Sequence, residues 1–101
     1  MKSRLELQSK LEELLGSRNV YYQPPESLKL EYPAIVYSKS KIESIHADDL
    51  KYANFNRYEI IVISKKPDHE VIHKLIDLLF SSYERHYVSD NMNHDVITLY
   101  F

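Results

Sequence analysis

The sequence predicts an α+β fold in which a mainly antiparallel sheet carries two amphipathic helices on one face. Two segments have apolar residues at helical spacing, and the stretches between and after them alternate as strands do. The expected order is helix, strands, helix and hairpin, without the repeated strand–helix–strand units of a parallel sheet. With 101 residues, 44% of them hydrophobic, residues 1–101 are expected to form a single domain with one core.

The first expected element is a helix that begins after Ser3. Ser3 and Glu6 have the spacing of a capping box, in which each side chain satisfies a free backbone N–H. Leucines at positions 7, 11, 14 and 15 place an apolar stripe on one face. Gly16, the only glycine of the chain, stands where a residue with left-handed backbone geometry ends a helix.

Three extended segments are expected next. A short one at residues 19–23 stops at Pro24 and Pro25, because proline cannot donate to a sheet. A second strand starts at residue 34 and continues with alternating polar residues to about residue 45. Residues 57–65 form the clearest expected strand, and both of its faces are apolar along residues 60–63, which predicts a central strand.

Residues 46–56 are expected to connect these last two strands. The segment is long for so small a domain, lacks glycine and carries Leu50, Tyr52 and Phe55. Loops of this length are usually functional or disordered, and aromatic segments seldom stay disordered. Two interpretations stay open: a hairpin arm that packs on a neighbouring subunit, and a surface flap folded back on its own core.

A second helix is expected from an N-cap at Asp68 to about Tyr83, followed by a hairpin. The hairpin pairs residues 85–89 with residues 94–101 around a turn of Asp and Asn residues, which tolerate left-handed geometry. The apolar stripe of the helix comprises Val71, Ile72, Leu75, Ile76, Leu78 and Leu79.

Composition excludes several kinds of site. The absence of cysteine excludes thiol catalysis, thiolate metal sites and disulfides. One glycine is too few for a phosphate-binding loop, a dinucleotide-binding loop or a nucleophile elbow. A net charge of -2 is no electrostatic footprint for nucleic acid, and no apolar run approaches the roughly 20 residues of a membrane span. We therefore expect no cofactor and no membrane partner.

One motif has the pattern of a catalytic zinc site. His69, Glu70 and His73 form an H-E-x-x-H segment, in which two histidines one helical turn apart can share a zinc ion beside a glutamate base. The following residues lack the glycine and third histidine of the extended motif, and helical spacing turns both histidines toward solvent. A chance match is favoured, and a small zinc hydrolase is kept as the alternative from another functional class. The paired acids Asp48–Asp49 and Asp90/Asp95 are interpreted as solvated loop residues.

The nine tyrosines lie mostly on or beside the expected strands. Exposed tyrosine, together with arginine and methionine, is typical of protein–protein contacts. A monomeric adaptor that binds a peptide along a sheet edge is a further alternative. The candidate subunit-interface residues are Leu50, Tyr52, Phe55, Tyr87, Met92 and Tyr100.

Several stretches, taken in order, resemble a family of small head–tail morphogenesis proteins of long-tailed bacteriophages and prophages. Its members are described as tail terminator, tail completion or minor capsid (head–tail joining) proteins, and the resemblance covers most of the chain from about Val20 onward. The stretches are VYYQPPES at 20–27, YPAIVY at 32–37, ADD at 47–49 with Tyr52, Arg57-Tyr58, Pro67-Asp68, and RHY at 85–87 followed by Asp90-Asn91, His94-Asp95 and TLY at 98–100.

The resemblance implies a structural, non-enzymatic subunit without catalytic residues. Such proteins form a ring, commonly a hexamer, that stops polymerisation of the tail tube and docks it to the head. The expected partners are further copies of the chain, the major tail tube protein and the head connector or completion protein, with DNA passing through the lumen without specific binding. The expected location is the head–tail junction of the virion, and the host cytoplasm before assembly. A head-completion or minor capsid protein of the same junction is the alternative within this class.

Overall fold

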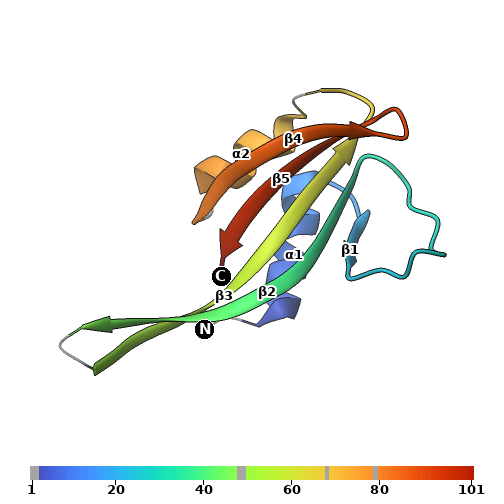
Figure 1. The fold of residues 1–101 in the computed structure, drawn as a ribbon. Helices are drawn as coiled ribbons and strands as arrows, with labels where there is room; N and C mark the ends of the chain where they lie inside the picture. The colour runs from blue at the N-terminus through green and yellow to red at the C-terminus, as the bar shows by residue number, and fades with distance from the viewer. Residues whose placement is uncertain (1–2, 48–49, 68, 79) are drawn as a thin grey trace.

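The computed structural model describes residues 3–47, 50–67, 69–78 and 80–101, and it leaves the side chains of residues 41–55 and 78 outside the description. It confirms a mixed α+β fold (Figure 1). The elements are α1 (Arg4–Leu15), β1 (Val20–Tyr22), β2 (Ala34–Ala47), β3 (Leu50–Ser64), α2 (Glu70–Leu78), β4 (Ser81–Ser89) and β5 (Met92–Tyr100).

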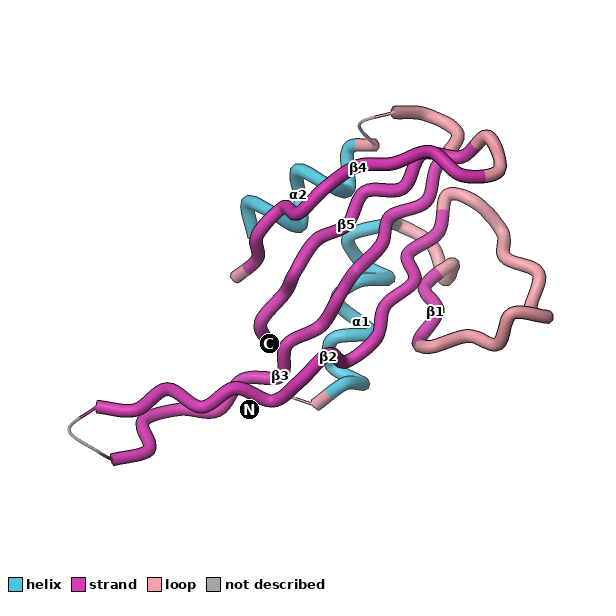
Figure 2. Tube along the Cα trace, viewed as in Figure 1, coloured by secondary structure: helices cyan, strands magenta, loops and turns pink. Residues whose placement is uncertain are grey.

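The five strands form one sheet in the order β1-β2-β3-β5-β4, with β3 at its centre as predicted. The pairs β2–β3, β3–β5 and β5–β4 are antiparallel. The sheet is nevertheless mixed, because β1 pairs with β2 in parallel, from Val20 opposite Ile35 to Tyr22 opposite Tyr37. The reason is the loop of residues 23–33, which carries the chain back before β2 begins (Figure 2).

One hydrophobic core joins the sheet to both helices, which lie behind the sheet in the view of Figure 1. Strand β3 contributes Tyr58, Ile60 and Val62 to this core, all 0% exposed. Helix α1 contributes Leu7, Leu11 and Leu14, and α2 contributes Val71, Ile72 and Leu75. Because Tyr58, Ile60 and Val62 stand at alternate positions of β3, they lie on the same face of the sheet, and this face packs against the helices.

The ends of α1 form as the sequence predicts. The Glu6 backbone N–H donates to Ser3 Oγ at 3.2 Å, which caps the first turn. Gly16 has a φ of 78°, and its N–H donates to the Glu12 carbonyl at 2.9 Å. A Cβ added at Gly16 would meet no atom within 4 Å, so the left-handed backbone, and not lack of space, requires glycine here.

The expected end of the second helix at Tyr83 is wrong, because α2 ends at Leu78 and β4 begins at Ser81. Pairing with β5 extends further back than local spacing indicates: Ser81 lies opposite Leu99, and the Tyr100 N–H donates to the Phe80 carbonyl at 2.9 Å. Ser81 Oγ also donates to the Leu75 carbonyl at 3.0 Å, which satisfies a helix-end acceptor.

The terminal hairpin turns at the predicted Asp and Asn residues. Asp90 and Asn91 have φ values of 53° and 63°, the geometry of a two-residue hairpin turn. The flanking residues Ser89 and Met92 pair directly, so the turn is tighter than the four residues expected.

The expected connection at residues 46–56 is also corrected, since β2 and β3 continue through it. The two strands pair as far as Ala47 opposite Leu50, so that only residues 48–49, outside the described part, join them. Figure 1 shows the distal halves of β2 and β3 projecting away from the rest of the sheet, and the molecule measures 49 × 24 × 22 Å. We call residues 41–47 and 50–56 the arm. The chain has an extended hairpin here, and the interpretation of a flap folded back on the core is wrong.

Two buried tyrosines stand close together on the helix side of the sheet. The ring centroids of Tyr37 and Tyr58 are 5.9 Å apart, and burial raises the pKa of both phenols above the ordinary value. The Tyr37 hydroxyl donates to Gln8 Oε1 at 2.5 Å and accepts from Arg4 at 3.3 Å. The Tyr58 hydroxyl has no hydrogen-bond partner among the residues that the structure describes. Tyr58 therefore contributes an unsatisfied buried polar group to the core.

We expect Tyr58→Phe to raise the free energy of unfolding by about 1 kcal/mol at neutral pH, because it removes this unsatisfied hydroxyl. The wild type should also lose stability as pH rises above about 10, since a raised folded-state pKa lets the unfolded chain ionise first, and the variant should lose less. Urea unfolding at about pH 7 and about pH 10.5 measures both effects. Tyr32→Phe, at a tyrosine that is 45% exposed, is the matched control and should change neither. A Tyr58→Phe variant less stable than the wild type contradicts this account.

Candidate functional site

The arm carries three of the six candidate interface residues. Leu50, Tyr52 and Phe55 all lie on β3 beyond the part that pairs with β5, and their side chains are outside the described part of the structure. In the register of the arm, Leu50 lies opposite Ala47 and Phe55 opposite Glu43, while Tyr52 falls at a register shift. The fold thus brings these residues together on one projecting strand, separate from the body of the sheet (Figure 2).

The other three candidates lie on the face of the sheet opposite the core. Alternation along β5 places Met92 and Tyr100 on that face, since Ile97 and Leu99 point into the core. Tyr87 joins them, because it pairs with His94 and its ring stacks on the His94 ring at 4.7 Å between centroids.

These three residues differ in what they offer to a partner. Tyr87 is exposed, with the Arg85 guanidinium 5.7 Å from its ring centroid. Tyr100 is half-buried against Phe80, whose ring centroid is 5.4 Å away and whose side chain is 68% exposed. Met92 is only 8% exposed, so it presents little surface for contact. Phe80, which was not predicted from the sequence, offers an exposed aromatic side chain next to Tyr100 in place of Met92.

His69 of the H-E-x-x-H segment has a local structural role. It immediately precedes α2, and its ring Nδ1 accepts a hydrogen bond from the Val71 N–H at 3.1 Å. Its carbonyl accepts from the Ile72 N–H at 3.0 Å. His69 therefore caps the helix, the role expected of Asp68, which lies outside the described residues. His73 follows on the exposed side of α2, and no group of three or more metal-ligating side chains that could hold an ion occurs within the described residues.

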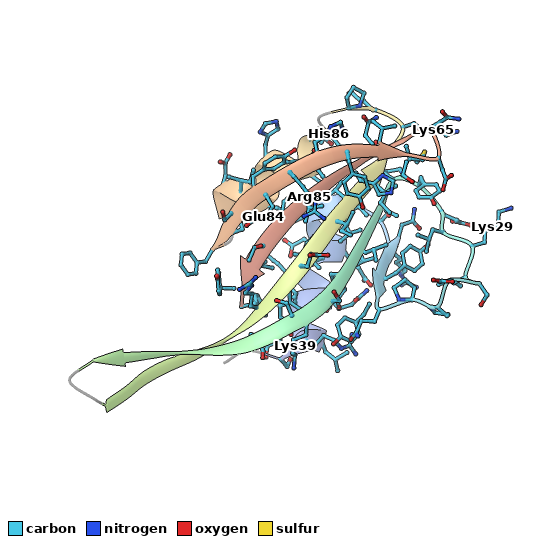
Figure 3. All side chains as sticks on the ribbon, viewed as in Figure 1. Lys29, Lys39, Lys65, Glu84, Arg85 and His86 are labelled. Carbon is cyan, nitrogen blue, oxygen red and sulfur yellow. The ribbon has the colours of Figure 1, made fainter. Side chains whose placement is uncertain are left out.

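A hollow of about 440 Å³ lies where β3 leaves the sheet toward α2. Next to it, the side-chain amide of Asn93 donates to the carbonyls of Ser64 and Lys65 at 3.3 and 3.1 Å. Two exposed lysines, Lys65 and Lys66, lie at this hollow, and Figure 3 labels Lys65. The lining residues are Tyr32, Pro33, Ser64, Lys65, Lys66 and His69.

A second hollow, of about 470 Å³, lies between α2 and β4. Its most unusual member is Asp95, which is 6% exposed and accepts a hydrogen bond from the Tyr83 hydroxyl at 2.6 Å. His86 is held on the β4 side by a 3.0 Å hydrogen bond between its Nε2 and Asn93 Oδ1. The lining residues are Pro67, Ile72, His73, Ile76, Tyr83, His86 and Asp95.

The sequence interpretation of Asp95 as a solvated loop acid is therefore wrong. Asp95 lies within β5, opposite Val62 of the central strand, on the side of the sheet that faces the helices. The signal that could have found it is period-two spacing, because Asp95 precedes the core residues Ile97 and Leu99 at alternate positions. Ile76 lines the same hollow and is 37% exposed, although it was expected in the buried stripe of α2.

Comparison with known proteins adds no family assignment. No model of a protein family matches the chain, and no curated protein matches it significantly. Within the part of the chain that the structure describes, no helix combines the length and the apolar character needed to cross a membrane.

Substitutions at His69 distinguish a role in capping α2 from a role in binding metal through the H-E-x-x-H segment. We expect His69→Ala to lower the free energy of unfolding by about 1 kcal/mol, because the Val71 N–H loses its acceptor. His69→Asp should retain wild-type stability, since a carboxylate at an N-cap accepts the same hydrogen bond but breaks the H-E-x-x-H pattern. Urea unfolding followed by circular dichroism measures the difference. Equal destabilisation by both substitutions contradicts the capping role.

Proposed function

We propose that the chain is a structural protein of a phage or prophage, a ring-forming subunit at the head–tail junction that ends the tail tube and docks it to the head. The observation that carries this proposal is the arm, which extends beyond the body of a small single-layer sheet. The resemblance in sequence to tail terminator and tail completion proteins supports the same assignment.

The arm needs a partner for physical reasons. Within the described residues, the pairing of β3 with the C-terminal strand ends at Asn56, which exchanges backbone hydrogen bonds with Phe101 at 3.1 and 2.9 Å, and β1 pairs with β2 only from Ile35 to Tyr37. Beyond Asn56, the described residues of the arm pair only with each other, and an isolated two-stranded hairpin is marginally stable in water. Tyr52 and Phe55 add aromatic residues of the kind that is enriched at the buried centre of interfaces. A neighbouring subunit would supply the missing contacts.

The arrangement favours contacts that close a ring. The arm projects at one end of the sheet, whereas Tyr87 pairs with His94 on the terminal hairpin, outside the arm. If the arm of one subunit packs on the terminal hairpin of the next, the two contacting surfaces differ. Such a head-to-tail contact generates a closed ring when the rotation closes. We favour a hexamer, on the resemblance to tail terminators.

The charge of the chain suits a lumen through which DNA passes. A net charge of -2 opposes tight binding of the phosphate backbone, which depends on clustered lysine and arginine. In this proposal the major tail tube protein meets one side of the ring and the head connector or completion protein meets the other. The protein acts without catalysis or cofactor.

A head-completion or minor capsid role at the same junction is the alternative, and gene deletion distinguishes the two. Deleting the gene from the phage or prophage genome that encodes it should yield overlong tails and heads without tails, because tube polymerisation has no stop. Electron microscopy of the lysate measures tail length, and expression of the chain from a plasmid should restore normal particles. Tails of normal length beside unattached heads would indicate the head-completion role. Intact particles would contradict both.

The subunit contact has its own test. We expect the double substitution Tyr52→Ser with Phe55→Ser to leave a folded monomer that no longer joins the ring, since these residues supply the apolar contact of the arm. Complementation of the deletion strain measures the loss, and circular dichroism measures folding. The matched control is Leu5→Ser with Leu28→Ser, at side chains 67% and 45% exposed outside the arm, which should complement normally. Full complementation by the arm variant would exclude the arm from the contact.

A further inference from the structure

The hollow between α2 and β4 holds a buried acid whose hydrogen-bond donor is a neutral hydroxyl. Asp95 is 6% exposed, and the Tyr83 hydroxyl is its side-chain hydrogen-bond donor. The carboxylate thus contacts a neutral hydroxyl, and His73 and His86 line the same hollow. Buried carboxylates are almost always paired, because an isolated charge is costly to remove from water. The hollow thus has the electrostatics of a site for a cation.

The other walls of the hollow indicate what kind of cation fits. Ile72, Ile76 and Pro67 are apolar, and they face the space beside Asp95. A lysine or arginine side chain combines an aliphatic stem with a charged end and so matches an apolar wall with a carboxylate. A metal ion fits poorly, because it needs several ligands, and the described residues contain no group of three that could hold one.

The hollow also adjoins an open sheet edge. Strand β4 is the last strand of the sheet, and its residues 82–89 are exposed, with Glu84, Arg85 and His86 along it in Figure 3. A register shift between Tyr83 and Arg85 interrupts the strand once, after which Arg85 to Ser89 pair regularly with β5. An extended peptide can add to such an edge through backbone hydrogen bonds, with alternate side chains entering pockets on one face. Tyr83 and His86 of this strand line the hollow.

We propose that β4 binds an extended segment of a partner protein as a sixth strand, and that a lysine or arginine of this segment enters the hollow and pairs with Asp95. Backbone hydrogen bonds along the edge supply sequence-independent affinity. The buried carboxylate supplies selectivity for a basic residue at one position of the segment. The site shares β4 with the ring contact proposed above but uses the helix side of the sheet, whereas Tyr87 of the ring contact lies on the opposite face, and its existence does not depend on the ring.

The test uses the full chain and a pair of peptides that differ in one charge. The probe is acetyl-Thr-Val-Arg-Val-Thr-amide, and its control has citrulline, a neutral analogue of arginine, in the central position. Titrations followed by amide chemical shifts in ¹⁵N–¹H spectra should show the arginine peptide shifting Tyr83, His86 and Asp95. We expect the citrulline peptide to bind roughly tenfold more weakly, as for loss of one hydrogen-bonded charge.

Two variants assign the effect to the buried acid. Asp95→Asn removes the charge and keeps an acceptor for the Tyr83 hydroxyl, and it should bind both peptides equally and weakly. Glu13→Gln makes the same change of charge at an exposed position on α1 and should keep the roughly tenfold preference.

Three results would overturn the proposal. The first is equal binding of the two peptides by the wild type, which decides the question even if the Asp95→Asn variant fails to fold. The second is an Asp95→Asn variant that keeps the preference. The third is a concentration-dependent shift of the same amides without peptide, abolished by Asp95→Asn, which would assign the hollow to a second copy of this chain.

Discussion

Burial of one face of β3 is the constraint on which the rest of the structure depends. Ile60 lies between Tyr37 of β2 and Ile97 of β5, and the apolar stripes of both helices reach the same cluster. Interiors of this kind are packed as densely as organic crystals, so a strand held on both edges and on one face has a single register. That register then determines where the neighbouring strands end, and with them the positions of the arm and of the edge strand β4.

The arm and the hollow beside Asp95 both lie where the packing around β3 ends. Beyond Asn56, which bonds to Phe101, the described parts of β2 and β3 continue as a pair that the core does not support. Toward the other end of β3, Asp95 occupies a core-facing position beside α2, where an apolar residue would be expected. A hairpin without a supporting layer and a carboxylate in a core-facing position both reduce the stability of the isolated chain. Contacts with other proteins would compensate for both.

Sequence reasoning predicted much of the fold but only part of the candidate site. It identified the cap and stop of α1, the central position of β3 and the turn at Asp90–Asn91, since each depends on residues close together in the chain. It found the segment of the arm from its aromatic content but expected a connection in place of paired strands. It interpreted Asp95 as a solvated acid although the expected strand 94–101 contains it, because the period-two spacing of Ile97 and Leu99 was not extended back to Asp95. The hollow between α2 and β4 was missed as well, since Tyr83, which lines it, was assigned to the helix.

By itself the sequence determined what local chemistry controls: a left-handed stop that requires Gly16, an extended strand with two apolar faces, and the absence of thiol and glycine-loop chemistry. Only the tertiary structure decided that residues 81–83 form a strand, that β1 runs parallel to β2, and that His69 caps α2 while Asp95 is buried. The physical reason is that strand identity depends on a partner across the sheet. Backbone hydrogen bonds offered by β5 outweigh a helical preference worth only tenths of a kcal/mol per residue, and no local pattern records which partner is present.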